Sequence, residues 1–405
     1  MNKIMNIKLP LTILGLVAGS ASAADHISIH HMSFEEYGDK VKAGDNVLSL
    51  EKNIGLDWTI TAELGYDTVS GASPAWVSTT PSSGSHDQIT QDAQNMTSEV
   101  IRAGYDPYRG NYEIRPVELE DTRYSASTNV TYRDKDRDEW TAGVNYSQEE
   151  DYKSMGANAK ALFYTDNTKN RSFSVGGSIL TDQTLAFQEY QNGGNAQEWQ
   201  DIFTSSMEVG MSQVFTPNLY AIFTAYGGYK SGYLSNHYLT VLREVDIDGD
   251  GSIGDDEVFL GQDSRPDTRI SGGVNLQAFY SVSNSVVVRP RYKFFTDDWG
   301  VTSHQLGGKM SVKVTDWLTF APGYFWYTQQ GANFFIDPKA QDPTFASTGY
   351  ATSDIRLGDF NANAYELGAS IKLSSKWRMN ALAAYYEQSN GYASNWWAVG
   401  VTYDY

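Results

Sequence analysis

The chain has 405 residues, no cysteine, and 49 Asp and Glu against 30 Lys and Arg, a formal net charge of −19. The lack of cysteine excludes disulfides, thiolate metal sites and attached c-type haem in this chain. The acidic balance argues against nucleic acid as a partner, because phosphate contacts need clustered Lys and Arg. Aromatic residues make up 13% of the sequence and hydrophobic residues only 40%. That profile is typical of transmembrane β-barrels, in which half of each strand faces lipid and aromatic side chains gather at the interfaces.

Residues 1–23 have the organisation of a secretory signal peptide. Two lysines, a short apolar stretch and the small residues Ala21-Ser22-Ala23 follow one another in the expected order. We therefore expect export, with residues 24–405 as the mature protein. No later segment approaches the about 20 apolar residues that a membrane-spanning helix needs.

The rest of the chain contains segments of roughly ten to fifteen residues in which apolar and polar side chains alternate. These predicted strands begin near His26, Asn46, Leu56, Thr122, Glu139, Gly156, Arg171, Ser205, Leu219, Arg269, Val286, Ser303, Leu318, Asn361, Trp377 and Trp396. An even number of strands returns both chain ends to the periplasm. The pattern predicts an all-β fold, a transmembrane antiparallel up-and-down β-barrel of about 16 strands, with 14 as the alternative count.

The connections between these strands favour one orientation in the membrane. Every second connection is tight, at 53–55, 134–138, 166–170, 216–218, 283–285, 315–316 and 374–376. All the long connections fall on the other side, at 70–120, 188–203, 232–267 and 329–358. Short periplasmic turns and long extracellular loops are typical of barrels in the Gram-negative outer membrane, where we place the protein. A soluble β-sandwich is the alternative fold.

The last predicted strand has an apolar face formed by Trp397, Val399, Val401, Tyr403 and Tyr405. A strand with this alternation and a final aromatic residue resembles the signal that barrel-insertion machinery recognises. We therefore expect that machinery and outer-membrane lipid as partners.

Residues 246–257 resemble a complete EF-hand calcium loop, with aspartate at positions 1, 3 and 5, glycine at 6 and glutamate at 12. The ligands that this resemblance implies for Ca²⁺ are Asp246, Asp248, Asp250, the Ser252 carbonyl and Glu257. The flanks, Tyr238–Val245 and Val258–Gln262, offer at most a turn or two of helix, so we expect one isolated, weak site. The alternative is a solvated acidic loop.

Catalysis finds little support in the sequence. The histidines are His26, His30, His31, His86, His237 and His304. His26 and His30 share a strand face, but hydrogen-bonded lumenal histidines without a catalytic role are commoner. No nucleophile elbow, zinc motif or phosphate-binding loop is present. We predict a protein that is not an enzyme.

Several basic residues are expected to point into the barrel, at positions 289, 291, 293, 309, 313 and 378, facing Glu63, Glu139 and Glu366. They form either a strip that attracts anions, as in general porins, or charge pairs that rigidify a plugged interior.

Four stretches together resemble one family: VSGASP at 69–74, DYKSMG at 151–156, RPDTR at 265–269 and DDWG at 297–300, the last followed by Ser303-His304. They are similar to a family of exported Gram-negative proteins of unknown function that are predicted to be outer-membrane barrels. The resemblance implies no established activity. Family members tend to occur beside thioredoxin-like, small lipoprotein and flavin-transferase partners, which implies a redox-linked envelope system.

Two classes of function follow from the sequence. The first is a channel or transport protein with a charged lumen and a surface calcium loop. The second is a scaffold, a barrel that sheathes or displays a small lipoprotein or redox partner.

Overall fold

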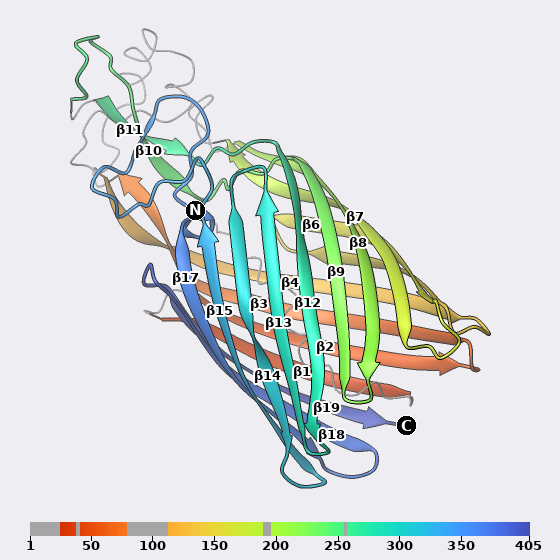
Figure 1. The fold of residues 1–405 in the computed structure, drawn as a ribbon. Coiled ribbons are helices and arrows are strands. Elements are labelled where there is room, and N and C mark those ends of the chain that lie inside the picture. Colours follow the sequence, from red (N-terminus) through yellow and green to blue (C-terminus); the bar gives the residue numbers. More distant parts are fainter. Residues whose placement is uncertain (1–24, 38–40, 79–111, 189–195, 255–256) are drawn as a thin grey trace.

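The computed structural model of the protein describes residues 25–37, 41–78, 112–188, 196–254 and 257–405, so the predicted signal peptide lies outside the described residues. Sixteen antiparallel strands close into one barrel (Figure 1). They are β1 (His26–Glu36), β2 (Val41–Ile54), β3 (Trp58–Ser78), β4 (Tyr112–Arg133), β5 (Glu139–Gln148), β6 (Tyr152–Tyr164), β7 (Arg171–Gln188), β8 (Ala196–Thr216), β9 (Leu219–Gly232), β12 (Thr268–Ser283), β13 (Val286–Asp297), β14 (Thr302–Lys313), β15 (Leu318–Gln330), β17 (Phe360–Lys372), β18 (Trp377–Gln388) and β19 (Ala393–Asp404). The predicted all-β barrel and its count of 16 are confirmed, and 14 strands are excluded.

The barrel closes where β1 pairs with both β2 and β19, with His26 opposite Asp404. Closure leaves no strand edge, which lipid would leave without hydrogen-bond partners. A separate three-stranded sheet, β11-β10-β16, is built from β10 (Thr240–Glu244), β11 (Val258–Gln262) and β16 (Thr344–Ala346), and a short 3-10 helix, η4, spans Ile355–Leu357. Within the described residues, no helix has the length and apolar character to cross a membrane.

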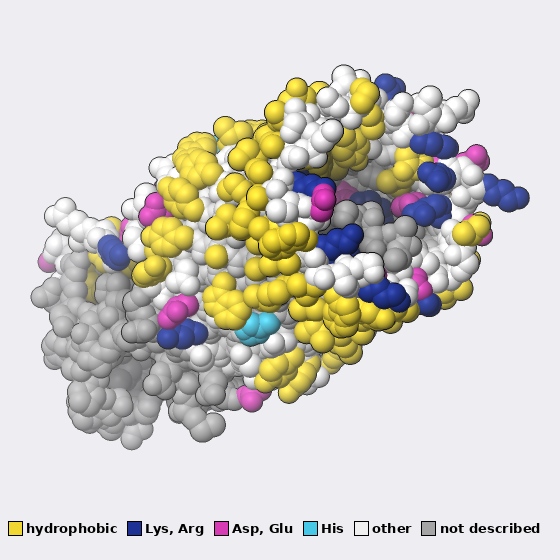
Figure 2. Space-filling model, turned by 90° about the horizontal axis from the view of Figure 1, so that it is seen from below, with side chains coloured by type: hydrophobic (Ala, Val, Ile, Leu, Met, Phe, Trp, Pro, Cys, Tyr) yellow, Lys and Arg dark blue, Asp and Glu magenta, His cyan; other side chains and the backbone are white. Residues whose placement is uncertain are grey.

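Outward-facing side chains form an apolar belt between two aromatic girdles. One girdle, near the short turns, includes Trp58, Tyr132, Trp140 and Trp377, and the other, near the long loops, includes Tyr66, Tyr124, Tyr146 and Tyr365, all of them exposed. Trp58 and Tyr66 are eight residues apart on β3, roughly 20 Å along the barrel axis for a tilted strand. This approaches the about 25 Å band of transmembrane barrels. Figure 2 shows the hydrophobic side chains on the wall and a charged opening at the end away from the loops.

The largest differences between the predicted and the observed strand starts lie at one end of the barrel. The strands β2, β4, β6, β8 and β19 begin earlier than predicted. All five start at the extracellular end, beyond the lipid that imposes an apolar side chain at every second position. The predicted loops 70–120 and 188–203 are accordingly shorter, because β3 reaches Ser78, β4 starts at Tyr112 and β8 starts at Ala196.

The loops 233–267 and 331–359 fold together into an extracellular cap, which contains the β11-β10-β16 sheet (Figure 1). Parallel pairing of β10 with β16 joins the two loops, and an isolated bridge joins Ser264 to Ala351. Val241, Phe345 and Ala351 form one buried apolar cluster, against which Ile336 packs. The cap is therefore a folded unit with its own small core.

The RPDTR and DDWG stretches attach this cap to the barrel. Arg269 contacts Asp297 with its Nε 2.7 Å from the Asp297 carboxylate, and its guanidinium lies 4.4 Å from the Trp299 ring centroid. Trp299 in turn donates its indole N–H to the Thr268 carbonyl over 2.8 Å and packs in a buried cluster with Leu357 of the cap. Gly300, with φ 94°, allows the tight turn between β13 and β14.

Candidate pore and calcium site

The inner wall of the barrel carries a run of basic side chains on β13. Arg289, Arg291 and Lys293 alternate with the outward-facing Pro290 and Tyr292, so all three point into the lumen. We call these three residues the basic strip. None of them forms a salt bridge with a carboxylate in the described part of the chain. The expectation that positions 289, 291 and 293 face the interior therefore agrees with the pairing register.

The other predicted lumenal cations are ion-paired. Lys309 reaches across Gly323 to Glu366, with 2.5 Å between Nζ and the carboxylate, and a side chain at position 323 would crowd the Lys309 stem. Arg378 lies 3.4 Å from Asp404. Lys313 pairs at 2.7 Å with Asp316 in a periplasmic turn, where both side chains are exposed. For these three residues the interpretation as charge pairs is the better one.

The predicted facing acids are also divided between two roles. Glu63 on β3 lies eight strands around the ring from β13, which is half of the circumference. Glu63 and Arg291 are each five residues from the periplasmic ends of their strands, so they lie at similar depth. Glu139 instead pairs with Arg133, and Glu366 pairs with Lys309. Of the three predicted acids, Glu63 lies on the wall opposite the basic strip, whereas Glu139 and Glu366 each have a basic partner, and Glu366 is also near enough to Arg291 to interact with it electrostatically.

The cap extends from one side of the barrel mouth to the other. Its first loop leaves β9, yet β10 and β11 contact β3, which is six strands away around the ring. Tyr238 of the same loop donates its hydroxyl to Asp151 in the turn between β5 and β6. A solute that reaches the lumen from outside must therefore pass beside this cap.

The acidic loop forms the tip of the β10–β11 hairpin. Its three aspartates, Asp246, Asp248 and Asp250, each offer a carboxylate oxygen within 4.8 Å of the others. Asp246 accepts backbone N–H groups from Gly249 at 2.7 Å and Gly251 at 3.0 Å. Both glycines have positive φ, 74° and 83°, a conformation that a side chain would strain. The structure thus brings together the aspartates that the sequence assigned to positions 1, 3 and 5.

The remaining predicted ligands lie differently. Glu257 is buried and lies outside the group of three, because its carboxylate accepts N–H groups of Ile247 and Gly254, each at 2.6 Å. Ser252 donates its hydroxyl to Asp250 over 2.6 Å. Glu257 would have to rotate toward the aspartates to complete a seven-oxygen site.

The flanks of this loop, for which the sequence allowed at most a turn or two of helix, form strands. Thr240–Glu244 and Val258–Gln262 are antiparallel strands, with Leu242 opposite Leu260. Val241, Val258 and Phe259 are fully buried in the cap. The packing of this hairpin inside the cap favours strands, because burial of those side chains contributes more to stability than local secondary-structure propensity does.

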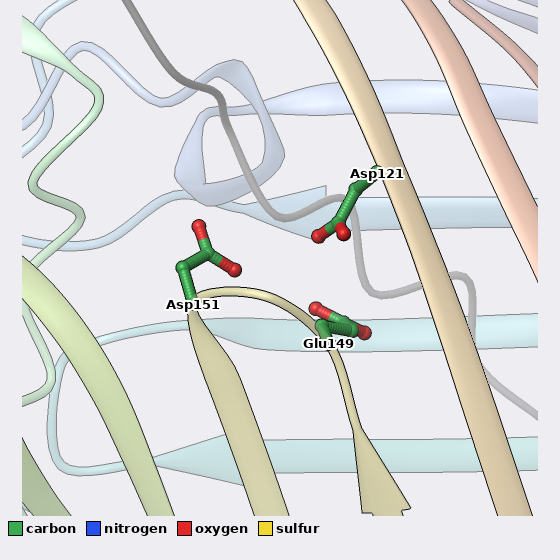
Figure 3. Close-up of side chains that lie close together, drawn as sticks. All are labelled: Asp121, Glu149 and Asp151. Carbon is green, nitrogen blue, oxygen red and sulfur yellow. The ribbon is translucent and has the colours of Figure 1, made fainter.

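A second acidic group was missed by sequence reasoning. Asp121 in the extracellular half of β4 and Glu149 and Asp151 in the β5–β6 turn point their carboxylates toward one another, within 4.8 Å (Figure 3). No spacing motif signals this group, because 28 residues separate Asp121 from Glu149 and only strand pairing brings them together. Carboxylates often gather at rims without an ion, so we assign no metal to it.

The histidines form no assembled catalytic group among the described residues. His26 and His30 share the lumenal face as expected, and His30 contacts the Ser28 hydroxyl at 3.1 Å. His31 and His304 point toward lipid, and His86 lies outside the described residues. In the cap, burial lowers the pKa of His237 to about 4, so this imidazole is neutral at neutral pH.

Solved structures with a similar fold are outer-membrane barrels. A bacterial polysaccharide outer membrane secretin shares 7% identity, covers 94% of this chain and 98% of its own, and has a TM-score of 0.48. The CymD monoaromatic hydrocarbon channel shares 9% identity over 94% and 88% of the two chains, with a TM-score of 0.40. A ferric enterobactin receptor mutant from Pseudomonas aeruginosa shares 7% identity, with a TM-score of 0.42. That match covers 91% of this chain and 54% of the receptor chain. These likenesses concern the fold alone.

Among curated proteins, none matches the sequence significantly. One family model, described as "Protein of unknown function (DUF3570)", matches residues 14–404. This confirms the resemblance to an uncharacterised family that the four short stretches indicated. Because the match spans nearly the whole sequence, the chain belongs to the DUF3570 family.

Proposed function

We propose that the protein is a non-enzymatic channel for small polar solutes in the outer membrane of a Gram-negative cell. The observation that carries this proposal is the closed barrel of 16 strands whose inner wall bears the basic strip, three cations that form no salt bridge with the described carboxylates. Barrels of 16 to 18 strands are wide enough for an aqueous channel, whereas barrels of about 8 strands are filled by side chains. Charge without a partner is costly in a dry interior, so the basic strip supports a wet lumen.

Purified protein in a planar bilayer is expected to produce discrete current steps whose size grows with salt concentration, because ions cross a water-filled lumen. Protein denatured before reconstitution is the control and should give none. A folded, heat-modifiable barrel that passes no current at any voltage would contradict the channel and favour the scaffold.

A calcium site at residues 246–257 is the second part of the proposal. The convergence of Asp246, Asp248 and Asp250 supports it, since three exposed carboxylates within 4.8 Å repel one another until a cation joins them. A dissociation constant of about 10⁻⁴ to 10⁻³ M is usual for extracellular modules. At ten times that constant, binding would stabilise the folded loop by ~1.4 kcal/mol. The role of the ion would be structural, to order the tip of the β10–β11 hairpin.

Calorimetry is expected to show one calcium site that Asp246→Ala or Glu257→Ala removes. Both substitutions delete an oxygen ligand, and Glu257→Ala deletes the only predicted ligand that binds through two oxygens. Asp337→Ala, at an exposed aspartate of the other cap loop, is the matched control and should bind as the unaltered protein does. If no binding heat is measured at millimolar calcium, or if both variants retain the binding heat, this segment is a solvated acidic loop.

A scaffold function has one observation in its favour, the folded cap on the outer end of the barrel. Such a surface is suited to holding a partner, for which the sequence suggested a small lipoprotein or a redox component. Co-purification from membranes at native expression level distinguishes this function, since a scaffold should retain its partner in detergent whether or not it conducts.

A further inference from the structure

The residues of the basic strip form no salt bridge with a carboxylate of the described residues, although Glu366, the partner of Lys309, is near enough to Arg291 to interact with it electrostatically. Arg133, Lys160, Lys309 and Arg378 each contact a carboxylate on the inner wall. The Nε atoms of Arg289 and Arg291 are buried and have no hydrogen-bond partner. Paired charges are enough to stiffen a barrel, so a purely structural role leaves these unpaired cations unexplained.

Neighbouring side chains hold the two guanidinium groups in place without neutralising them. Arg289 donates to the Ser311 hydroxyl at 2.6 Å, and Arg291 donates to the Gln305 side-chain oxygen at 3.1 Å. The Arg291 guanidinium also lies 4.6 Å from the Phe325 ring centroid. A side chain at Gly307 would overlap the Phe325 ring, so the glycine makes this contact possible. Each arginine is thereby oriented and keeps its full charge.

The spacing of the strip matches ligands with more than one acidic oxygen group. Successive inward residues of a strand are about 6.6 Å apart, so neighbouring positions of the strip can contact two carboxylates of one short molecule. The planar guanidinium donates two parallel N–H bonds, which suits carboxylate and phosphate better than a spherical anion. Glu63 on the opposite wall repels anions toward the strip.

We infer that the basic strip is a binding site for small oxyanions, above all short dicarboxylates, on their way through the lumen. This inference rests on the proposed channel function. Arg289 and Arg291 bind the acid groups, and Lys293 on the extracellular side of Arg291 attracts them into the strip.

The test compares two double substitutions that remove the same charge from the lumen. Arg289→Gln with Arg291→Gln neutralises the unpaired arginines, and Arg133→Gln with Arg378→Gln neutralises two paired ones. Zero-current potentials in gradients of potassium succinate, phosphate or chloride give each anion's permeability relative to K⁺. The first variant is expected to lose succinate permeability about fivefold, the equivalent of ~1 kcal/mol for one charge contact in water. Chloride should change less, and the second variant should match the unaltered protein.

Further variants separate this inference from misfolding and from the channel proposal. Heat-modifiable migration establishes that each barrel is closed, and Arg289→Lys with Arg291→Lys should keep most of the succinate permeability. A larger effect on phosphate than on succinate would favour inorganic phosphate as the ligand and overturn the dicarboxylate. Equal permeabilities in the two glutamine variants would overturn the site itself. If the folded protein does not conduct, the channel proposal fails, and calorimetric titration with succinate tests the binding site by itself. Binding heat that is lost only in the Arg289→Gln with Arg291→Gln variant would support the site. Absence of binding heat in the unaltered protein would overturn the site.

Discussion

Replacing Tyr403 and Tyr405 together with aspartate is expected to abolish assembly of the barrel and leave export intact. Both side chains lie on the lipid-facing side of the strand that closes the ring against β1. Tyr403 lies 4.7 Å from Trp377 and 6.4 Å from Tyr405 between ring centroids, and Lys52 of β2 lies 5.0 Å from the Tyr405 ring. The substitution removes these contacts and the aromatic pattern that resembles an insertion signal.

The measurement is heat-modifiable migration of protein extracted from membranes, because only a closed barrel migrates differently before and after boiling. Charged side chains near the interface cost only about 0–1 kcal/mol each, so a complete loss would point to failed recognition more than to instability. The matched control replaces both tyrosines with phenylalanine, which keeps the rings and should assemble. Normal heat-modifiability of the aspartate variant would contradict the recognition hypothesis.

Asp354→Ala is expected to release the cap while the barrel remains closed. Asp354 is buried and receives hydrogen bonds from Arg265 at 3.0 Å and from Arg356 at 2.7 and 2.8 Å. Arg265 also contacts Asp263 at 2.8 Å, so one carboxylate links the two cap loops. Removal of one member of such a buried group destabilises the closed cap by about 3–5 kcal/mol. The equilibrium population of the open cap should therefore rise by more than about a hundredfold.

Limited proteolysis measures this opening, since the cap loops become cleavable only when they separate. The matched control is Asp337→Ala, an exposed aspartate in the same loop, which should leave cleavage unchanged. Equal cleavage rates in the two variants would show that the apolar clusters hold the cap without the ion pairs.

The two buried carboxyls that share Arg265 shift in opposite directions: burial outweighs Arg265 at Asp263 and raises the pKa of that carboxyl, whereas the pKa of Asp354 is lowered. Burial by itself would raise the pKa of Asp354, but the adjacent guanidinium groups of Arg356 and Arg265 outweigh burial and hold the pKa well below its usual range. A carboxyl whose folded pKa is lowered stabilises the fold above its unfolded pKa of about 3.9 and loses that contribution only as pH falls toward the folded value. A carboxyl whose folded pKa is raised, as at Asp263, loses no stability on acidification, so protease resistance of the cap should be no lower at pH 5 than at pH 7.

Sequence alone was sufficient for the membrane-spanning part of this protein. Lipid imposes an apolar side chain at every second position, and the short periplasmic turns leave little doubt about the residue at which a strand begins. Strands such as β5, β7 and β13 therefore begin where the alternation begins, at Glu139, Arg171 and Val286. The same alternation placed Arg289, Arg291 and Lys293 on the inner wall.

Which charged side chains pair with one another could be determined only from the tertiary structure. A strand pattern states which side of the wall a residue faces, and the up-and-down order states which strands are neighbours, but neither states the register that brings two particular side chains together. Glu366 therefore appeared to be an opposing acid, whereas it is the partner of Lys309 across β15. That the basic strip forms no salt bridge, whereas Lys309 and Arg378 do, is likewise a property of the tertiary structure.

The cap was also decided by tertiary structure, because no lipid constrains the extracellular loops. The calcium-like spacing of Asp246, Asp248 and Asp250 is local, so the sequence contained it, and the loop folds much as that spacing requires. The hairpin that carries it forms strands because Val241, Val258 and Phe259 are fully buried, and Val241 packs with Phe345 and Ala351, about a hundred positions away. Local patterns determined the barrel wall and the aspartate loop of this protein, and long-range packing determined what covers its mouth.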